Sequence, residues 1–258
     1  MWSTTRRQPS GPRELHLDFD APIGRFSIPE GIRSACIFVT VARLAACEAD
    51  PNASGFVNIS QTMALIDRLA ANGIYTLFLS TNQVFDGESP HVRADAPASP
   101  RSEYGRQKAE TERQLRAHTE AGDPIGILRL AKVVSPGMAL LSDWKRALAA
   151  GRTIHLFSDM RMAPTPIDIV ASLIAQMMQD CSPFIAQLSG PRDITYAEAG
   201  RFLASRIGAD PRLVEPVSAC DAGVPRGATP RHTTLDSSAI ASKYGSTVPD
   251  AFEVIVRL

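Results

Sequence analysis

Apolar stretches of strand length alternate with helical patterns along the first half of the chain, and this alternation constrains the fold more than any other feature. Residues 35–41 form a continuous apolar run, which is typical of a strand buried on both faces, and residues 75–79 are expected to form the next buried strand. Residues 61–72 instead follow a helical period and end at Gly73, a typical C-terminal cap. The expected strands are 14–19, 35–41, 75–79 and 125–130, and the expected helices are 61–72 and 104–118. This alternation predicts an α/β fold, with a doubly wound parallel sheet covered by helices on both faces.

The pattern changes after about residue 134, where a Pro-Gly pair interrupts the chain and prolines become frequent. Two further helices are expected, one over residues 167–178 and one after Thr195, which forms a capping-box pattern with Glu198. We therefore expect a core formed by residues 1–134, with 160–180 returning to it, and a smaller lobe formed by residues 135–159 and 181–258.

Composition excludes several classes of function. The chain has 258 residues, with 27 Lys or Arg against 27 Asp or Glu, so its formal net charge is zero. No basic excess indicates nucleic-acid binding, and no charged block or long apolar stretch indicates contact with a membrane. The four cysteines are scattered and form no C-x-x-C pair, so we expect reduced thiols and no metal site. Because the N-terminus has no apolar segment of the secretory type, a cytoplasmic location is expected.

Candidate catalytic residues lie at the end of the strand at 75–79 and on the charged helix that comes next along the chain. Thr81 follows the strand, and Tyr104 and Lys108 lie four residues apart, on one face of the helix. A free phenol has a pKa near ~10, and both a nearby ammonium and a helix N-terminus favour the phenolate. We therefore expect Lys108 to lower the pKa of Tyr104, so that the phenol can pass a proton to a carbonyl oxygen held by Thr81. Alone, Y-x-x-x-K is a weak motif, and a solvated helix face is the alternative interpretation.

The match is longer than this motif, and the chain resembles the extended short-chain dehydrogenase/reductase family. It includes the strand-ending S-T, the turn V-F-D-G, a proline-rich loop, and the glutamates that follow Lys108. Within the family the chain looks most like the dTDP-4-dehydrorhamnose reductase group, which reduces or otherwise modifies nucleotide-linked sugars. The resemblance implies a Rossmann-like fold with a substrate-binding lobe and NADP or NAD as cofactor. It also implies catalytic roles for Thr81, Tyr104 and Lys108, and a contact between Lys108 and the nicotinamide ribose.

Weaker likenesses extend this resemblance over most of the chain. Segments 47–51, 57–58, 128–130, 159–165 and 230–236 each look like a stretch of the family. In the last of them proline and arginine are reversed, and Arg231 is expected to contact a phosphate of the nucleotide sugar. Arg129 is expected to be a structural partner at the sheet edge. Residues 80–83 read S-T-N-Q where the family often has S-T-D-Y, which keeps the hydroxyl but leaves the substrate unassigned.

One signature of the family is missing, namely the Gly-rich turn after its first strand, which holds the pyrophosphate of the cofactor. The likeness begins at the family's second strand, at residues 2–5, so we expect a core truncated at its N-terminus, without the first strand and helix. Arg6 and Arg7 would then pair with the 2′-phosphate of NADP, and Asp18 would lie near the adenine. Two solvated arginines near a chain end are the alternative. The truncation would make the chain either a fragment of a working enzyme or a natural truncated relative.

Two functions are compatible with these features. The intact trio favours an NAD(P)-dependent reductase or epimerase of a nucleotide-linked sugar. The missing glycine turn favours a non-catalytic binding or regulatory protein, such as the regulatory subunit of methionine adenosyltransferase, which belongs to the same family. A homodimer is expected only by analogy with relatives. The sequence leaves open the sugar, the nucleotide, the choice of NAD or NADP, and reduction against epimerisation.

Overall fold

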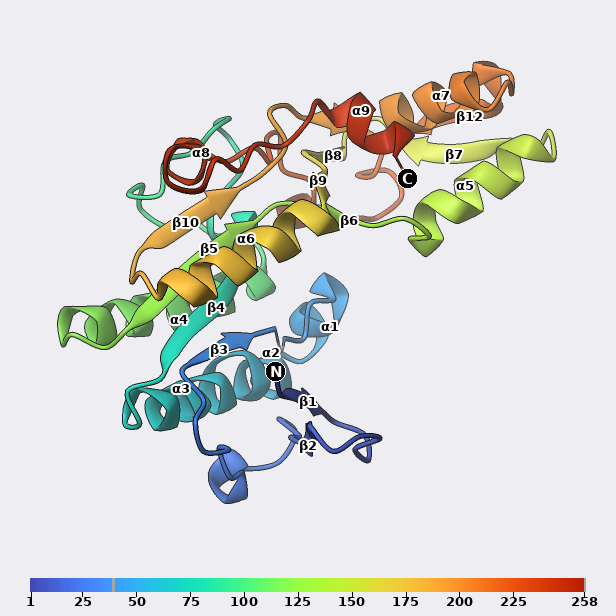
Figure 1. Cartoon of the computed structure of the whole chain (residues 1–258). Helices are drawn as coiled ribbons and strands as arrows, with labels where there is room; N and C mark the ends of the chain where they lie inside the picture. Colours follow the sequence, from blue (N-terminus) through green and yellow to red (C-terminus); the bar gives the residue numbers. More distant parts are fainter. Residues whose placement is uncertain (39, 258) are drawn as a thin grey trace. The chain divides into compact units, whose positions relative to one another are not determined.

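The computed structural model describes residues 1–38 and 40–257 (Figure 1). Backbone contacts divide the chain into two compact units. Unit 1 comprises Met1–Leu79, Ser102–Ile127 and Met177–Phe184, and unit 2 comprises Ser80–Arg101, Leu128–Gln176 and Ile185–Leu258. The boundary between the units passes through individual strands and one helix. It therefore does not decide where the predicted core ends and the predicted substrate-binding lobe begins, and that division stays a prediction.

A four-stranded sheet with the strand order β10-β5-β4-β3 forms the centre of the fold. β3 (Ser34–Ile37) pairs in parallel with β4 (Tyr75–Thr81). β4 and β5 (Ile125–Leu130) are buried along almost their whole length, as predicted for residues 75–79. The prediction of a strand buried on both faces is wrong for β3, because β3 is the last strand of the sheet and only Ile37 of its four residues is buried. β10 spans Ile185–Leu188. The predicted fold class is confirmed, because the chain is an α/β protein with a parallel central sheet.

β3 is shorter than the strand predicted over residues 35–41, and the side chain of Asn58 explains part of the difference. The Asn58 carboxamide accepts a hydrogen bond from the Val41 N–H at 2.7 Å and donates one to the Val41 carbonyl at 3.2 Å. Backbone groups satisfied by a side chain do not need a neighbouring strand. The ladder of β3 with β4 ends at Ile37 and Phe78, and residue 39 of the predicted strand lies outside the described residues.

The N-terminal segment forms a separate two-stranded parallel sheet, in which β1 (Ser3–Thr5) pairs with β2 (Glu14–His16). β2 stops short of the strand predicted over residues 14–19. The Asp18 carboxylate accepts the backbone N–H of Asp20 at 3.0 Å, a local turn that competes with extended pairing. A short 3₁₀ helix, η1 (Ile23–Arg25), follows.

The helices predicted over residues 61–72 and 104–118 are present to within a few residues, whereas the helical segments over residues 44–61 were not predicted. α1 (Leu44–Ala49), α2 (Pro51–Gly55) and the π-helical turn η2 (Phe56–Gln61) lead into α3 (Thr62–Ala70). Gly73 has a φ of 64°, the left-handed conformation expected of a C-terminal cap. α4 (Glu103–Glu120) begins after Ser102, whose hydroxyl accepts the N–H of Gly105 at 3.1 Å.

Unit 2 contains short strand pairs and helices around a second apolar core. Trp144, Leu156 and Leu203 are among the buried residues of this core. The capping box predicted at Thr195 and Glu198 is confirmed, because both of its reciprocal hydrogen bonds are present. The elements are η3 (Asn82–Val84), β6 (Val133–Val134), α5 (Ala139–Ala149), β7 (Ile154–Phe157), β8 (Arg161–Met162), β9 (Thr165–Pro166), α6 (Ile167–Asp180, which continues into unit 1), β11 (Ile194–Thr195), α7 (Tyr196–Arg206), η4 (Pro211–Leu213), β12 (Val214–Val217), η5 (Arg226–Ala228), α8 (Ser238–Tyr244) and α9 (Ala251–Val256).

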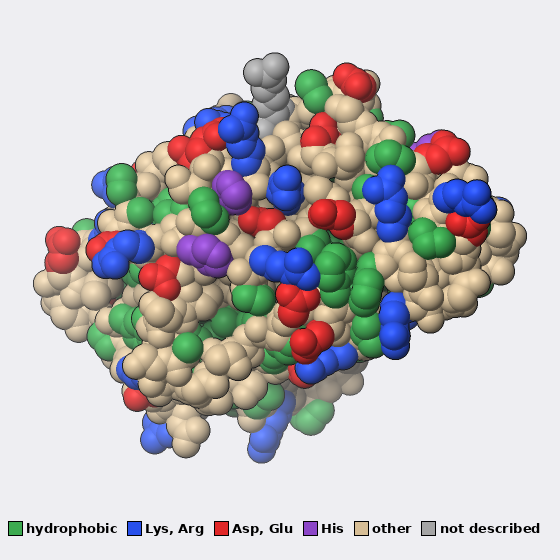
Figure 2. Space-filling model, turned by 90° about the horizontal axis from the view of Figure 1, so that it is seen from above, with side chains coloured by type: hydrophobic (Ala, Val, Ile, Leu, Met, Phe, Trp, Pro, Cys, Tyr) green, Lys and Arg blue, Asp and Glu red, His purple; other side chains and the backbone are tan. Residues whose placement is uncertain are grey.

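The exposed charges alternate in sign. Figure 2 shows Lys and Arg side chains interspersed with Asp and Glu side chains on one face, in keeping with the net charge of zero. Exposed ion pairs such as Arg192 with Asp250, at 2.6 Å, contribute to this pattern. Among residues 1–38 and 40–257, no helix is both long and apolar enough to cross a bilayer. The same residues contain no group of three or more His, Cys, Asp or Glu side chains that could hold a metal ion.

Candidate active site

Tyr104 and Lys108 lie in the first two turns of α4, where the cap at Ser102 fixes the start of the helix. The four-residue spacing places both side chains on one helix face, as the sequence predicts. The Lys108 ammonium nitrogen lies 6.0 Å from the centroid of the Tyr104 ring and 4.4 Å from that of Phe78. Unit 1 therefore brings together two of the three predicted catalytic residues.

Lys108 is one of the most deeply buried charged side chains of the chain, with 2% of its surface exposed. Its ammonium nitrogen donates a hydrogen bond to the carbonyl oxygen of Leu79 at 2.9 Å. Burial lowers the pKa of Lys108 to about 8, and the nearby Glu112 carboxylate partly opposes this shift. A solvated helix face, the alternative considered from the sequence, is wrong for Lys108.

Tyr104 is half-buried, and its pKa differs from the sequence-based expectation. Burial raises the pKa of Tyr104 to about 12, while a hydrogen bond with the Thr40 hydroxyl acts in the opposite direction and the neighbouring Cys47 adds a smaller upward effect. We expected Lys108 to lower this pKa. The net shift is upward because the free-energy cost of removing the phenolate from water is larger than the stabilisation that its neighbours provide.

Thr81 belongs to unit 2, unlike the other two residues of the predicted trio. It is the last residue of β4 and is buried, with 7% of its surface exposed. Its hydroxyl accepts the backbone N–H of Gln83 at 3.2 Å and donates to the Asn82 carboxamide oxygen at 3.3 Å. The hydroxyl thus caps the 3₁₀ turn η3, and its predicted role at a substrate oxygen stays a prediction.

The predicted cofactor contacts at the N-terminus lie beside the two-stranded sheet. Arg6 and Arg7 are exposed, and the Arg6 guanidinium pairs with the Asp20 carboxylate at 3.3 Å. Asp18 is half-buried, and one of its oxygens is used in the turn to Asp20. The geometry neither assigns these side chains to a cofactor nor excludes them, and their binding role stays a prediction.

The glycines closest to a possible pyrophosphate site do not form a Gly-rich turn. In the described part of the chain, Gly11 lies between β1 and β2, Gly24 lies within η1, and Gly31 precedes β3. None of the three follows a strand of the four-stranded sheet and leads into a helix, which is the arrangement that holds a pyrophosphate. These three glycines therefore do not fit the pyrophosphate of a dinucleotide.

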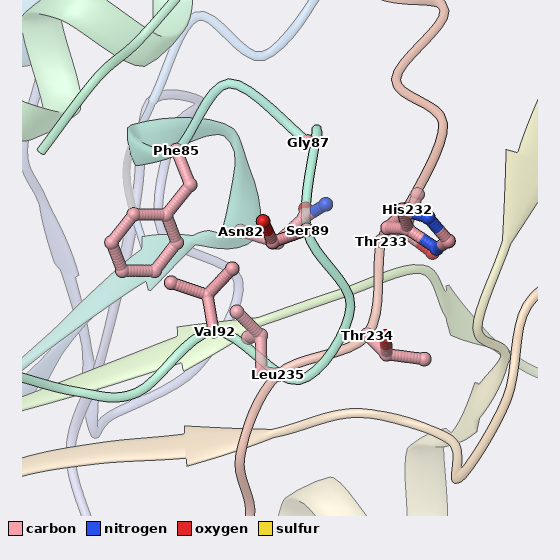
Figure 3. A pocket seen from close by; sticks show the side chains of 9 residues that line it. All are labelled: Asn82, Phe85, Gly87, Ser89, Val92, His232, Thr233, Thr234 and Leu235. Carbon is pink, nitrogen blue, oxygen red and sulfur yellow. The ribbon is translucent and has the colours of Figure 1, made fainter. Parts of the chain in front are cut away.

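Arg231, the predicted substrate contact, is exposed, and the next residue, His232, lines a small pocket in unit 2. The Arg231 guanidinium is 3.8 Å from the Glu88 carboxylate. The pocket is lined by two loops, which meet where Val92 and Leu235 form a parallel bridge (Figure 3). The lining residues are Asn82, Phe85, Gly87, Ser89, Val92, His232, Thr233, Thr234 and Leu235. The sequence did not predict this pocket, although two of the family-like segments form it.

Arg129 is fully buried on β5 and has the structural role expected from the sequence. Its guanidinium donates to the Ala94 carbonyl and to the Gln187 carboxamide oxygen, each at 3.0 Å, and lies 4.9 Å from the ring centroid of Phe85. It does not lie at a sheet edge, because β5 has β4 and β10 as neighbours.

Three polar residues of unit 1 form a hydrogen-bonded group to which the sequence analysis assigned no role: Thr40, Asn58 and Gln107. Asn58 and Gln107 are buried, with 1% and 2% of their surfaces exposed, and the Asn58 amide donates to the Gln107 carboxamide oxygen at 2.7 Å. The Thr40 hydroxyl donates to the Asn58 carboxamide oxygen at 3.0 Å. Asn58 lies in the π-helical turn η2, an irregularity often found near functional sites. The available signals were the family-like segment at residues 57–58 and the polar residue at position 107, on the same helix face as Tyr104.

The parallel sheet, with Tyr104 and Lys108 on one face of α4, is the arrangement expected from the resemblance to the short-chain dehydrogenase/reductase family. Residues 36–257 match the family described as "RmlD substrate binding domain", so the chain belongs to this family. The resemblance to the dTDP-4-dehydrorhamnose reductase group is thereby confirmed.

Curated relatives include both enzymes and a regulatory subunit. The chain is 28% identical over 211 residues to the probable low-salt glycan biosynthesis reductase of Haloferax volcanii, covering 79% of this chain and 69% of that protein. It is 26% identical over 221 residues to methionine adenosyltransferase 2 subunit beta of Xenopus tropicalis, covering 81% and 64%. It is 27% identical over 251 residues to dTDP-4-dehydrorhamnose reductase of Sinorhizobium fredii, covering 91% and 83%.

Solved structures share the fold at low sequence identity. One is the dTDP-4-dehydrorhamnose reductase of Bacillus anthracis in complex with NADP, which matches with a TM-score of 0.77. The identity is 16%, and the match covers 87% of this chain and 79% of that chain. At this identity the similarity shows the fold alone.

Proposed function

We propose that the protein is an NAD(P)-dependent reductase or epimerase that acts on a nucleotide-linked sugar. The observation that carries this proposal is the buried Lys108 beside the half-buried Tyr104 on α4, with the ammonium 6.0 Å from the ring centroid. A lysine with 2% exposure is costly, and such a group is usually retained for function. Membership of the RmlD substrate binding domain family, and relatives that are named as sugar-modifying reductases, support the substrate class.

The roles of the residues follow from their chemistry. Tyr104 is the acid that passes its phenolic proton to the oxygen of a sugar carbonyl, and Thr81 holds that oxygen through its hydroxyl. Lys108, whose ammonium lies beside the Tyr104 ring, stabilises the phenolate that remains. A bound nicotinamide would supply or accept the hydride at the sugar carbon. We further propose that Lys108 contacts the nicotinamide ribose, and that Arg6, Arg7 and Asp18 contact the far end of the cofactor.

We also propose that residues 135–159 and 181–258 form the substrate-binding lobe, with Arg231 at a phosphate of the nucleotide. Arg231 is exposed, and its contact with the Glu88 carboxylate is long, at 3.8 Å. Its guanidinium therefore keeps N–H donors available for a phosphate.

Two experiments, first cofactor binding and then turnover, test this function. NADPH and NADH are titrated against the 258-residue chain by fluorescence, and turnover is then followed with a dTDP-linked 4-keto sugar. Removal of a general acid costs about 10²- to 10⁴-fold in rate, so we expect a loss of this size in kcat for Tyr104→Phe, with cofactor affinity unchanged. A Tyr104→Phe variant that keeps full activity would refute the mechanism.

A non-catalytic regulatory role is the second candidate. Two observations favour it: the described glycines form no pyrophosphate-binding turn, and methionine adenosyltransferase 2 subunit beta is among the relatives. A folded chain that binds neither NADPH nor NADH, and that co-purifies with a defined catalytic subunit, would support this role over the enzymatic one.

A further inference from the structure

One carboxylate of unit 2 lies between two arginines that come from different segments of the chain. The Glu88 carboxylate is 2.5 Å from a guanidinium nitrogen of Arg101 and 3.8 Å from one of Arg231. The two arginines contact different oxygens of this carboxylate. All three side chains are exposed, so a ligand can reach them from solvent. We call these three residues the Glu88 cluster.

Hydrogen bonds of the neighbouring backbone hold the three segments of the Glu88 cluster together. Ser99 donates its N–H to the Val84 carbonyl at 2.9 Å, and its hydroxyl accepts the Asp86 N–H at 3.1 Å. The His232 N–H donates to the Gly87 carbonyl at 2.9 Å, and Figure 3 shows these two loops side by side. The fold therefore brings the two guanidinium groups together, in addition to their attraction to the carboxylate between them.

Two guanidinium groups that share one anion can also bind a phosphate. The planar fork of guanidinium N–H donors matches phosphate as well as carboxylate oxygens. Because Arg101 and Arg231 both reach the single carboxylate of Glu88, one anionic group of similar size can contact both of them. The diphosphate of a nucleotide-linked sugar carries two negative charges against one for Glu88, and it has more acceptor oxygens. A diphosphate can therefore compete with Glu88 for these donors.

We propose that Arg101 and Arg231 form the binding site for the diphosphate of the nucleotide-linked substrate, and that Glu88 holds both arginines until the diphosphate displaces it. The inference rests on the proposed function, which supplies the substrate class. It adds Arg101 to the site, since the sequence pointed only to Arg231. On binding, the diphosphate oxygens accept the N–H donors of both arginines, and the Glu88 side chain turns to solvent. No covalent bond changes.

The other charged side chains of the same loop have partners of their own. The Asp86 carboxylate accepts the Glu88 N–H at 3.0 Å, which makes it part of a local turn. Arg93 and Asp95 form an exposed ion pair with two contacts, at 3.0 and 3.1 Å. This pair joins one arginine to one carboxylate, whereas the Glu88 cluster joins two arginines to one carboxylate. Arg93 and Asp95 therefore provide matched control positions.

Calorimetric titration with dTDP tests the proposal without turnover. Glu88→Gln removes the competing charge, and Arg101→Gln and Arg231→Gln each remove one proposed phosphate contact. We expect Glu88→Gln to bind dTDP roughly three- to tenfold more tightly than the wild-type protein, because two exposed ion pairs no longer compete with the ligand. The two arginine variants should bind dTDP more weakly by a similar factor.

The control variants make the same changes of charge at the other ion pair. Asp95→Asn and Arg93→Gln should bind dTDP like the wild-type protein. Tighter binding in Glu88→Gln cannot result from damage to the fold, because damage weakens binding. A Glu88→Gln variant that binds dTDP no more tightly than Asp95→Asn would overturn the proposal, and so would an Arg101→Gln variant with the wild-type affinity.

A parallel titration with NADPH distinguishes the diphosphate of the substrate from the phosphates of a cofactor. We expect Glu88→Gln to leave the affinity for NADPH unchanged, and an affinity that rises together with that for dTDP would overturn the assignment to the substrate. A wild-type chain that binds no dTDP would overturn the proposal as well. Turnover of a dTDP-linked 4-keto sugar by the wild-type chain is measured separately, so failure of this site is distinguishable from failure of the proposed function.

Discussion

Replacement of Lys108 by methionine should make the protein more stable at neutral pH while removing its proposed activity. The pKa of Lys108 falls from 10.5 to about 8 through burial, a change of about 2.5 units. At 1.36 kcal/mol per unit, holding the ammonium in the folded chain at pH 7 costs about 3 kcal/mol. The hydrogen bond to the Leu79 carbonyl offsets roughly 1–2 kcal/mol of this cost. We therefore expect Lys108→Met to gain about 1–2 kcal/mol of unfolding free energy at pH 7.

The gain should shrink as the pH rises. Above its folded-state pKa of about 8, Lys108 releases its proton in the folded chain but keeps it in the unfolded chain up to 10.5. The unfolded state then binds more protons, so the wild-type protein gains stability relative to Lys108→Met with increasing pH. Between pH 7 and pH 9 this relative gain is about 1.4 kcal/mol.

Urea unfolding of the wild-type protein and of Lys108→Met at pH 7 and pH 9 measures the gain in unfolding free energy at pH 7 and its change with pH. Taking the difference between the proteins cancels the opposing effect of Cys36, whose pKa is raised to about 12 by burial. Lys243→Met, at an exposed lysine, is the control and should show no pH-dependent difference. A Lys108→Met variant that is less stable than wild type at pH 7, with a difference that does not change by pH 9, would refute the reasoning.

Two further predictions concern a turn in unit 2 and the start of α4 in unit 1. Gly87→Ala should destabilise the protein by roughly 2–4 kcal/mol in urea unfolding, because a Cβ there would lie within 3 Å of Pro230 and the His232 carbonyl at a φ of 71°. Gly137 has a similar φ of 75° but no atom near the added Cβ, so Gly137→Ala should lose only the stability that corresponds to the backbone strain. Equal losses of unfolding free energy in the two variants would contradict the predicted clash at Gly87. Ser102→Ala should cost about 1 kcal/mol through loss of the α4 cap, and Ser102→Asp should restore it. Equal stability of these two variants in thermal unfolding would argue against the cap.

Local pattern alone was enough to predict much of the central sheet. β4 and β5 follow from apolar stretches of strand length, a pattern typical of buried strands. The start of α4, and with it the shared face of Tyr104 and Lys108, follows from helical spacing. The capping box at Thr195 follows from two residue types three positions apart. Each of these features depends on residues that are neighbours in the sequence.

Tertiary structure decided the features that join distant residues. β3 and β2 are shorter than predicted because side chains of Asn58 and Asp18 take over hydrogen bonds that the pattern assigned to strands. The pKa of Tyr104 is raised rather than lowered, because burial depends on everything that packs around the ring. Residue identity and spacing determine which groups can meet on one helix. Solvent exclusion and contacts across long sequence separations depend on the folded chain, and these determine how strongly each group is bound and which protonation state it favours.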